Sequence, residues 1–320
     1  MSSTPTPKRM HVIIAFALVY VLWGSTYLAI RLAVDHLSPL MMGGLRFTTA
    51  GLMMLGYRAA TGHRIWITRQ ELLRLSIIGI LLLVTSNVVL GWAETMIPTG
   101  LAALFIAITP LWFLMLERLS HGHERLSPRG LAGIFLGVVG VLILLWPDLT
   151  GHSGLDRRQL FGAALVLFSS VSWASGSVLV KRWHMAVDPY TASGWQMLVA
   201  GLIGGVLALA SGDLHRTNWV ASSLWAIVYL VFAGSLIGYT AYVWLLKNVP
   251  ISKVSTYAYV NPIVAVILGV LLHGERMDGY MLAGSVVVIL SVVLVTGAKV
   301  RNANQETEAI ELEPVEPSGD

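Results

Sequence analysis

Residues 11–34 read HVIIAFALVYVLWGSTYLAIRLAV, an apolar run in which Arg31 is the only charged residue. An α-helix needs about 20 apolar residues to cross the hydrocarbon core of a bilayer, and this stretch is long enough. It is too long for the apolar core of a signal peptide, and no small-residue cleavage pattern follows it. We therefore predict that it is a retained first transmembrane helix.

The whole chain has the composition of an integral membrane protein. Of its 320 residues, 56% are hydrophobic and 12% are charged, whereas soluble domains carry about 25% charged residues. Six of the 17 acidic residues lie between Glu306 and Asp320, which leaves the apolar body with still fewer. The sequence contains no cysteine, so disulfides, thiolate metal sites and cysteine nucleophiles are excluded. Its basic residues are scattered, which argues against a nucleic-acid surface.

Nine further apolar runs follow the first one, and short connections separate them. The ten predicted spans are residues 11–34, 39–60, 72–91, 97–116, 129–146, 159–181, 189–211, 221–246, 251–273 and 277–298. Ser38-Pro39 and Asp188-Pro189 each provide an N-cap acceptor followed by a proline at the first helical position. Because the connections are short, neighbouring helices must run antiparallel, and no soluble domain fits between them.

The distribution of lysine and arginine predicts the orientation. With the N-terminus inside, 15 of the 21 Lys and Arg residues fall in inner segments and four in outer loops, while Arg31 and Arg46 lie within spans. Cytoplasmic loops are enriched in these residues. We therefore expect both termini in the cytoplasm: a tail at 1–10, and an acidic tail at 299–320.

The chain resembles itself at an offset of about 150 residues. Trp23-Gly-Ser aligns with Trp173-Ala-Ser, Pro39 with Pro189, and Pro110 with Pro262. This divides the chain into two repeats, 11–146 and 159–298, of five spans each. Because five is odd, the second repeat must enter the membrane from the opposite side. Inverted repeats are typical of secondary transporters, whose substrate site lies between the halves.

Several motifs resemble a known family. They are Trp23-Gly-Ser-Thr-Tyr with Pro39 and Arg46-Phe47, Ile97-Pro-Thr-Gly-Leu-Ala-Ala-Leu leading to Thr109-Pro110-Leu, and Tyr257-Ala-Tyr-Val-Asn-Pro-Ile-Val-Ala-Val with Gly274-Glu275. In order and spacing they resemble the EamA-type transporters of the drug/metabolite transporter superfamily, and most of all its YedA-like inner-membrane members. The resemblance implies an all-α protein of ten transmembrane helices in the bacterial inner membrane that exports small metabolites, amino acids or drugs.

Two prolines are predicted to bend the fourth and ninth spans. Pro110 and Pro262 have equivalent places in the repeats, and each follows a polar residue, Thr109 or Asn261. Proline has no N–H and clashes with the carbonyl four residues earlier, so each helix should kink. The kinks could be static packing features or hinges at a cavity.

Aromatic and polar residues within the spans are candidates for a substrate cavity. Tyr20, Trp23, Tyr27 and Arg31 share one face of the first helix. Tyrosine hydroxyls and indole N–H groups lack partners in lipid, so side chains this deep should face the bundle interior, as cavity walls or as ordinary packing. The candidate cavity residues are Trp23, Tyr27, Asn87, Thr109, Trp173, Ser177, Tyr239, Tyr242, Tyr257 and Asn261.

Two charged residues could have a role within the membrane. Arg46 lies about 10 Å into the second span, at 1.5 Å per residue, where it could bind a substrate carboxylate, extend to the interface or have a structural role. Glu94 lies at the outer edge of the third span and could be a solvated rim residue. No carboxylate or histidine falls at the centre of a span, which argues against a proton relay and suggests transport without strict proton coupling. Gly133-x3-Gly137 in the fifth span predicts close packing within the chain.

These features predict a secondary transporter that works by alternating access and is not an enzyme. We expect a small-molecule substrate and the lipid bilayer as partners, no nucleic acid, no ATP, no cofactor and no metal, in a monomer or weak homodimer. His121-Gly-His123-Glu124 does not match a metalloprotease motif, and there is no nucleotide-binding P-loop. An intramembrane enzyme and a channel-like facilitator without alternating access are the alternatives.

Overall fold

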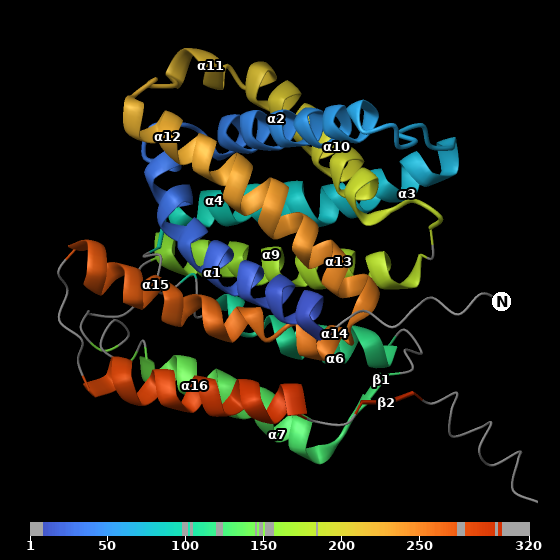
Figure 1. Ribbon diagram of the computed structural model, residues 1–320. Coiled ribbons are helices and arrows are strands. Elements are labelled where there is room, and N and C mark those ends of the chain that lie inside the picture. Colours follow the sequence, from blue (N-terminus) through green and yellow to red (C-terminus); the bar gives the residue numbers. More distant parts are fainter. Residues whose placement is uncertain are drawn as a thin grey trace, which may run out of the picture.

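The computed structural model is almost entirely helical (Figure 1). It describes residues 9–97, 102, 105–119, 124–144, 146, 150, 157–183, 185–273, 279–297 and 300–302. In the first repeat the elements are α1 (Arg9–Val34), α2 (Pro39–Ala60), α3 (Arg69–Gly79), the π-helix η1 (Ile80–Val88), α4 (Val89–Glu94), α6 (Thr109–Leu119), β1 (Glu124–Leu126) and α7 (Pro128–Leu144). In the second repeat they are α9 (Arg157–Arg182), α10 (Pro189–Ala210), α11 (Asp213–Arg216), α12 (Ala221–Tyr229), the π-helix η2 (Leu230–Tyr239), α13 (Thr240–Asn248), α14 (Ile251–Val254), α15 (Tyr257–His273), α16 (Gly279–Gly297) and β2 (Val300–Asn302).

Among the described residues, five continuous helices are long and apolar enough to cross a membrane. They are Arg9–Val34, Arg69–Glu94, Arg157–Arg182, Pro189–Ala210 and Ala221–Asn248. Two of these helices contain the π-helices: α3, η1 and α4 form one, and α12, η2 and α13 form the other. The fold is therefore that of a helical membrane protein.

The predicted N-caps of α2 and α10 are confirmed. The Ser38 hydroxyl accepts a hydrogen bond from the Met41 amide at 3.0 Å, and the Asp188 carboxylate accepts from the amides of Tyr190 and Thr191 at 3.0 and 3.1 Å. Proline follows at the first helical position in both cases, where its missing N–H costs no helical hydrogen bond.

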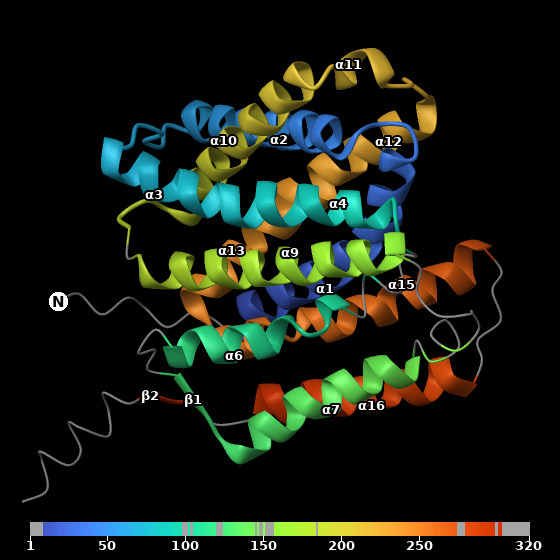
Figure 2. The same cartoon turned by 180° about the vertical axis from the view of Figure 1, so that it is seen from behind.

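The α2 and α10 helices pack along each other at one end of the molecule (Figures 1 and 2). Glycines permit backbone contact here. A Cβ atom on Gly44 would lie 2.8 Å from the Gly205 Cα, and one on Gly201 would lie 2.1 Å from the Thr48 nitrogen. Further along, a Cβ on Gly194 would meet the side chain of Leu55 at 2.9 Å. Residue numbers rise along one helix as they fall along the other, so the two helices are antiparallel.

A second antiparallel pair, α7 and α16, lies at the opposite end of the molecule (Figures 1 and 2). A Cβ on Gly133 would lie 2.8 Å from Val295, and one on Gly137 would lie 2.7 Å from the Tyr259 ring and 2.9 Å from Ser291. The two predicted glycines thus serve packing within the chain, as expected.

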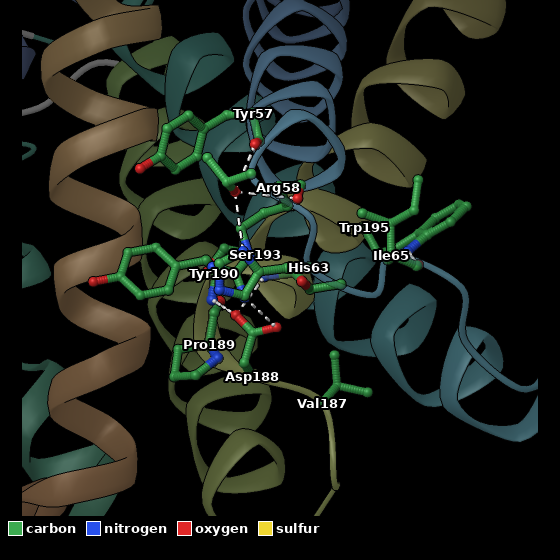
Figure 3. Close-up of polar contacts among 12 residues, drawn as sticks. Tyr57, Arg58, His63, Ile65, Val187, Asp188, Pro189, Tyr190, Ser193 and Trp195 are labelled. Carbon is green, nitrogen blue, oxygen red and sulfur yellow. Dashed lines mark hydrogen bonds and ion pairs between the residues drawn. The ribbon is translucent and has the colours of Figure 1, made fainter.

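Polar contacts fasten one end of the α2–α10 pair (Figure 3). Arg58 in α2 forms an ion pair with Asp188 at 3.2 Å, and its guanidinium carbon lies 5.6 Å from the centre of the Tyr190 ring. The Trp195 indole donates to the Ile65 carbonyl at 2.9 Å. Partial burial raises the pKa of Asp188, but its hydrogen bonds to Thr191 and Tyr190 and the charge of Arg58 outweigh burial and lower it below its usual value.

A short antiparallel ladder, which the sequence did not predict, joins β1 to β2. Glu124 pairs with Asn302, and Leu126 with Val300. The segment after α16 therefore lies against the connection that leads into α7. The remainder of the acidic tail, 303–320, lies outside the described residues.

Candidate functional site

An aromatic cluster occupies the middle of the helical bundle. The Trp23 ring in α1 lies 4.8 Å from Tyr242, 5.2 Å from Tyr257 and 5.3 Å from Trp173, measured between ring centroids. Tyr239 joins through Trp173 at 6.5 Å. Three of these pairs meet edge to face, an arrangement that the aromatic quadrupole favours, and the Trp23–Tyr242 pair is tilted. Helices from both repeats contribute rings to the cluster.

Hydrogen bonds fix the polar ends of these rings. The Trp23 indole donates to the Gly234 carbonyl at 3.1 Å, and the Trp173 indole donates to the Tyr242 hydroxyl at 2.9 Å. Ser177 shares a 2.7 Å hydrogen bond with the same hydroxyl. The Tyr239 hydroxyl donates to Gln196 Oε1 at 2.7 Å, so the glutamine at the position equivalent to Arg46 orients a tyrosine. The rings are thus held in place by partners inside the protein.

A cavity of about 650 Å³, including open space at its mouth, adjoins this cluster. Eight of the ten predicted cavity residues line it: Trp23, Tyr27, Asn87, Thr109, Trp173, Tyr239, Tyr257 and Asn261. The other two, Ser177 and Tyr242, do not line the cavity: Tyr242 packs against Trp23 at a tilt, and Ser177 is hydrogen-bonded to Tyr242.

Two π-helices in equivalent places of the repeats form part of the cavity wall. The η1 segment begins at Ile80 and η2 at Leu230, which are 150 residues apart. In η1, side chains bond carbonyls five residues earlier: Thr85 Oγ1 donates to Ile80 at 3.0 Å and Asn87 Nδ2 to Leu82 at 3.2 Å. π-Helical turns are rare and are often found at functional sites. No proline or other local signal marks them in the sequence.

Arg46 lies on the cavity wall and does not extend to the membrane interface. Its side chain is 4% exposed, and its Nε donates to Ser235 Oγ at 2.8 Å. The guanidinium carbon lies 4.7 Å from the centre of the Phe47 ring. Its Nη1 is buried and has no hydrogen-bond partner in the part of the chain that the structure describes. The interpretation that Arg46 extends outward is therefore wrong, because Ser235 and Phe47 hold the guanidinium inside the bundle.

The predicted fourth span, 97–116, is interrupted just before Pro110, because residues 105–106 are helical and α6 begins again only at Thr109. Residues 107–108 form a turn, and Pro110 follows as the second residue of the helix, where no helical hydrogen bond is lost. Pro110 has no N–H to donate to the Ile106 carbonyl, and this carbonyl accepts a hydrogen bond from Thr109 Oγ1 at 2.5 Å.

Pro262 lies inside α15 as predicted, and both it and Asn261 are buried. Because Pro262 has no N–H, it cannot donate to the Ala258 carbonyl. The α1 helix approaches α15 closely here: a Cβ on Gly24 would lie 2.5 Å from Val264 and 3.2 Å from the Asn261 carbonyl. Asn261 lies on the cavity wall, and its buried Oδ1 has no hydrogen-bond partner within the described ranges.

Glu94, at the end of α4, is not a solvated rim residue. Its exposure is 0%, and neither carboxylate oxygen has a hydrogen-bond partner among the described residues. Arg31 donates to its backbone carbonyl and forms an ion pair with Asp35. The sequence places Glu94 correctly at a helix end but does not show that other helices cover that end.

Sequence reasoning missed several small polar residues of the wall: Thr26, Ser86, Ser169 and Ser170. All four are buried, and Ser170 accepts a hydrogen bond from the Trp112 indole at 2.9 Å. Their occurrence within apolar spans was the available signal, but serine and threonine also bond the preceding turn of their own helix, as Thr26 does to the Trp23 carbonyl.

Comparison with known proteins gives the family. The EamA-like transporter family matches residues 10–146 and 160–297. "Uncharacterized inner membrane transporter YedA" of Escherichia coli K12 is 37% identical over 285 residues, covering 89% of this chain and 90% of YedA. "Probable amino-acid metabolite efflux pump" of the same organism is 26% identical over 310 residues, covering 89% and 95% of the two chains. A solved crystal structure that is 19% identical has a TM-score of 0.76 and covers 96% of this chain and all of its own, which shows a shared fold. The chain therefore belongs to the EamA-like transporter family and is a membrane transporter.

Proposed function

We propose that this protein is a secondary transporter of the inner membrane that exports a small organic solute by alternating access through the central cavity. The observation that carries the proposal is the composition of the cavity wall. Residues of α1, α2, η1 and α4 from the first repeat meet residues of α9, η2 and α15 from the second repeat around one space. A substrate bound there contacts both halves, so a movement of one half against the other changes the side from which the substrate is reached.

The packing of equivalent helices supports an inverted arrangement of ten spans. The α2 and α10 helices begin 150 residues apart, at Pro39 and Pro189, and they lie antiparallel along each other. The α7 and α16 helices, which begin at Pro128 and Gly279, do the same. Equivalent helices of opposite direction are what two inverted five-helix repeats produce.

The proposed orientation has both termini in the cytoplasm, from the excess of Lys and Arg in the inner segments. Reporters active in the cytoplasm should work when fused after Arg69, Arg125 or Lys181. Reporters active in the periplasm should work after Asp156 or Gly212. Opposite results at two or more of these sites would reject the ten-span topology with an inside N-terminus.

Transport is tested in proteoliposomes by efflux and uptake of radiolabelled amino acids and lipophilic cations, with and without a pH gradient. A cavity variant and a surface variant give a matched pair: Ser86 is buried on the cavity wall, whereas Leu52 is exposed on α2. Ser86→Trp should fill the cavity and stop flux, and Leu52→Trp should leave flux near the wild-type rate. Equal flux in both variants would show that solute does not pass through this cavity.

Alternating access is distinguished from a channel by labelling single cysteines, since the chain has no native cysteine. Thr26→Cys and Ser86→Cys place thiols on the cavity wall. With a carrier, a transported solute should change labelling from the two sides in opposite directions. Equal and simultaneous labelling from both sides would instead indicate a channel-like facilitator.

A further inference from the structure

The cavity wall contains a buried cation that no carboxylate of the described residues neutralises. Within the described residues, Arg46 has one side-chain hydrogen bond, from Nε to Ser235, while its Nη1 is buried and unpartnered. The ion pairs found within the described residues are Arg31–Asp35 and Arg58–Asp188, and neither involves Arg46. An arginine stays protonated inside proteins, so its charge must be compensated in another way.

Leaving this charge unpaired is unfavourable. A buried charge requires a partner or hydrogen bonds to offset the water it has lost. The ring of Phe47 offers a cation–π contact, which compensates only in part. The site therefore gains most from an anion, and a carboxylate matches the planar donor arrangement of a guanidinium.

Residues of the second repeat determine where the Arg46 side chain lies. A Cβ on Gly234 would lie 2.7 Å from Arg46 Nη2 and 3.1 Å from Thr26 Cγ2, so the guanidinium occupies the space that a side chain at 234 would need. The carbonyl of the same glycine accepts the Trp23 indole hydrogen bond at 3.1 Å. One residue of η2 thus positions both the cation and an aromatic ring of the cavity.

The remaining wall is suited to the rest of such a ligand. Trp23, Trp173, Tyr239 and Tyr257 present apolar ring surface to the cavity. Asn261 adds a second buried polar atom without a partner, its Oδ1. Aromatic rings bind flat apolar groups by stacking or edge contacts.

We propose that the cavity binds an organic carboxylate with a flat apolar group, with the carboxylate on Arg46 and the apolar group between the aromatic side chains. This inference rests on the proposed function, since it names the substrate class of the same cavity. Phe47 and Ser235 orient Arg46, and Gly234 leaves it room.

The test measures binding to the full-length protein in detergent by calorimetry. The probes are 3-phenylpropanoate, its neutral amide and 2-phenylethylammonium, which share the ring but differ in charge. The wild type should bind the carboxylate at least tenfold more tightly than the other two, a difference of about 1.4 kcal/mol. Arg46→Met should abolish that preference while leaving the amide affinity unchanged. Arg58→Met removes an arginine of the same helix outside the cavity and should keep the preference.

Two further variants keep the test decisive if Arg46→Met does not fold. Arg46→Lys retains the charge but loses the planar guanidinium, which can donate two parallel hydrogen bonds to a carboxylate, and it should weaken carboxylate binding severalfold. Gly234→Ala retains Arg46 and pushes its guanidinium aside, and should weaken carboxylate binding in the same direction. The proposal would be overturned if the wild type did not bind the carboxylate, or bound it no more tightly than the amide. It would also be overturned if carboxylate binding were unchanged in all Arg46 and Gly234 variants.

Binding in detergent and flux in proteoliposomes separate the two proposals. If the protein bound the carboxylate through Arg46 but transported no solute, the carboxylate site would be supported and transport through the cavity would be rejected. Flux of a cation or neutral solute, without preference for carboxylates, would support the proposed transport function and reject carboxylates as its substrate class.

Discussion

The contact between α2 and α10 at Gly201 leads to a quantitative prediction for Gly201→Ala. An added Cβ would lie 2.1 Å from the Thr48 backbone nitrogen, whereas ordinary contact begins near 3.4 Å, so the deficit is 3.4 − 2.1 = 1.3 Å. Because the obstructing atom belongs to the backbone, no rotamer change relieves the clash and the helices must separate. Overpacking of this kind costs about 1–3 kcal/mol. We expect the upper part of that range, because separation also loosens the Gly44–Gly205 contact.

Gly205→Ala is the matched control, four residues later in the same helix. A Cβ there would meet nothing within 4 Å. Alanine also favours a helix over glycine by about 0.5–1 kcal/mol, so this variant should be as stable as the wild type or more stable. The free energy of unfolding is measured by titration with a denaturing detergent and followed by tryptophan fluorescence. Equal stability of the two variants would refute the backbone contact between α2 and α10.

Three further predictions concern the hinge, the buried carboxylate and the polar end of α2. Pro262→Ala should lower transport more than Pro110→Ala, because Pro262 lies inside α15 whereas Pro110 lies at the start of α6. Equal flux in both variants would reject a hinge at Pro262. Glu94→Gln should unfold at the same temperature as the wild type or higher, because it removes a buried carboxylate that has no partner among the described residues. Solute exchange by the wild-type protein in proteoliposomes should persist without a pH gradient. Loss of exchange both without the gradient and in Glu94→Gln would show that Glu94 carries a proton. Since the folded-state pKa of Asp188 is lowered, its contribution to stability is present above the ordinary value of 3.8 and is lost as pH falls through the folded value. The stability difference between wild type and Asp188→Asn should therefore hold above about pH 5 and shrink below about pH 4; a constant difference down to pH 3 would contradict the Arg58–Asp188 pair.

Much of this protein follows from local chemistry along the chain. The apolar run at 11–34 predicts α1, because a helix satisfies its own backbone hydrogen bonds in lipid. Ser38 and Asp188 mark the starts of α2 and α10, because an N-cap acts on amides two or three residues away. Deep Trp and Tyr residues predict an interior cluster, because their polar atoms find no partner among lipid tails.

Tertiary structure decides what depends on partners from distant helices. Pro110 is the second residue of α6, just after the turn at 107–108, whereas Pro262 in the equivalent place lies inside α15. The burial of Glu94 and Arg46 depends on which helices cover them, and the spacing of charges along the sequence does not encode this.

The π-helices η1 and η2 are the clearest example of local structure that depends on tertiary packing. Their sequences are ordinary apolar runs, yet both shift to a wider turn where the two repeats meet. The sequence by itself determined the membrane-spanning helices, their caps and the two repeats, because hydrophobicity, capping and self-similarity can be observed along a single chain. Only the tertiary structure decided that Gly234 of one repeat leaves space for Arg46 of the other, because that space exists only when the helices have packed.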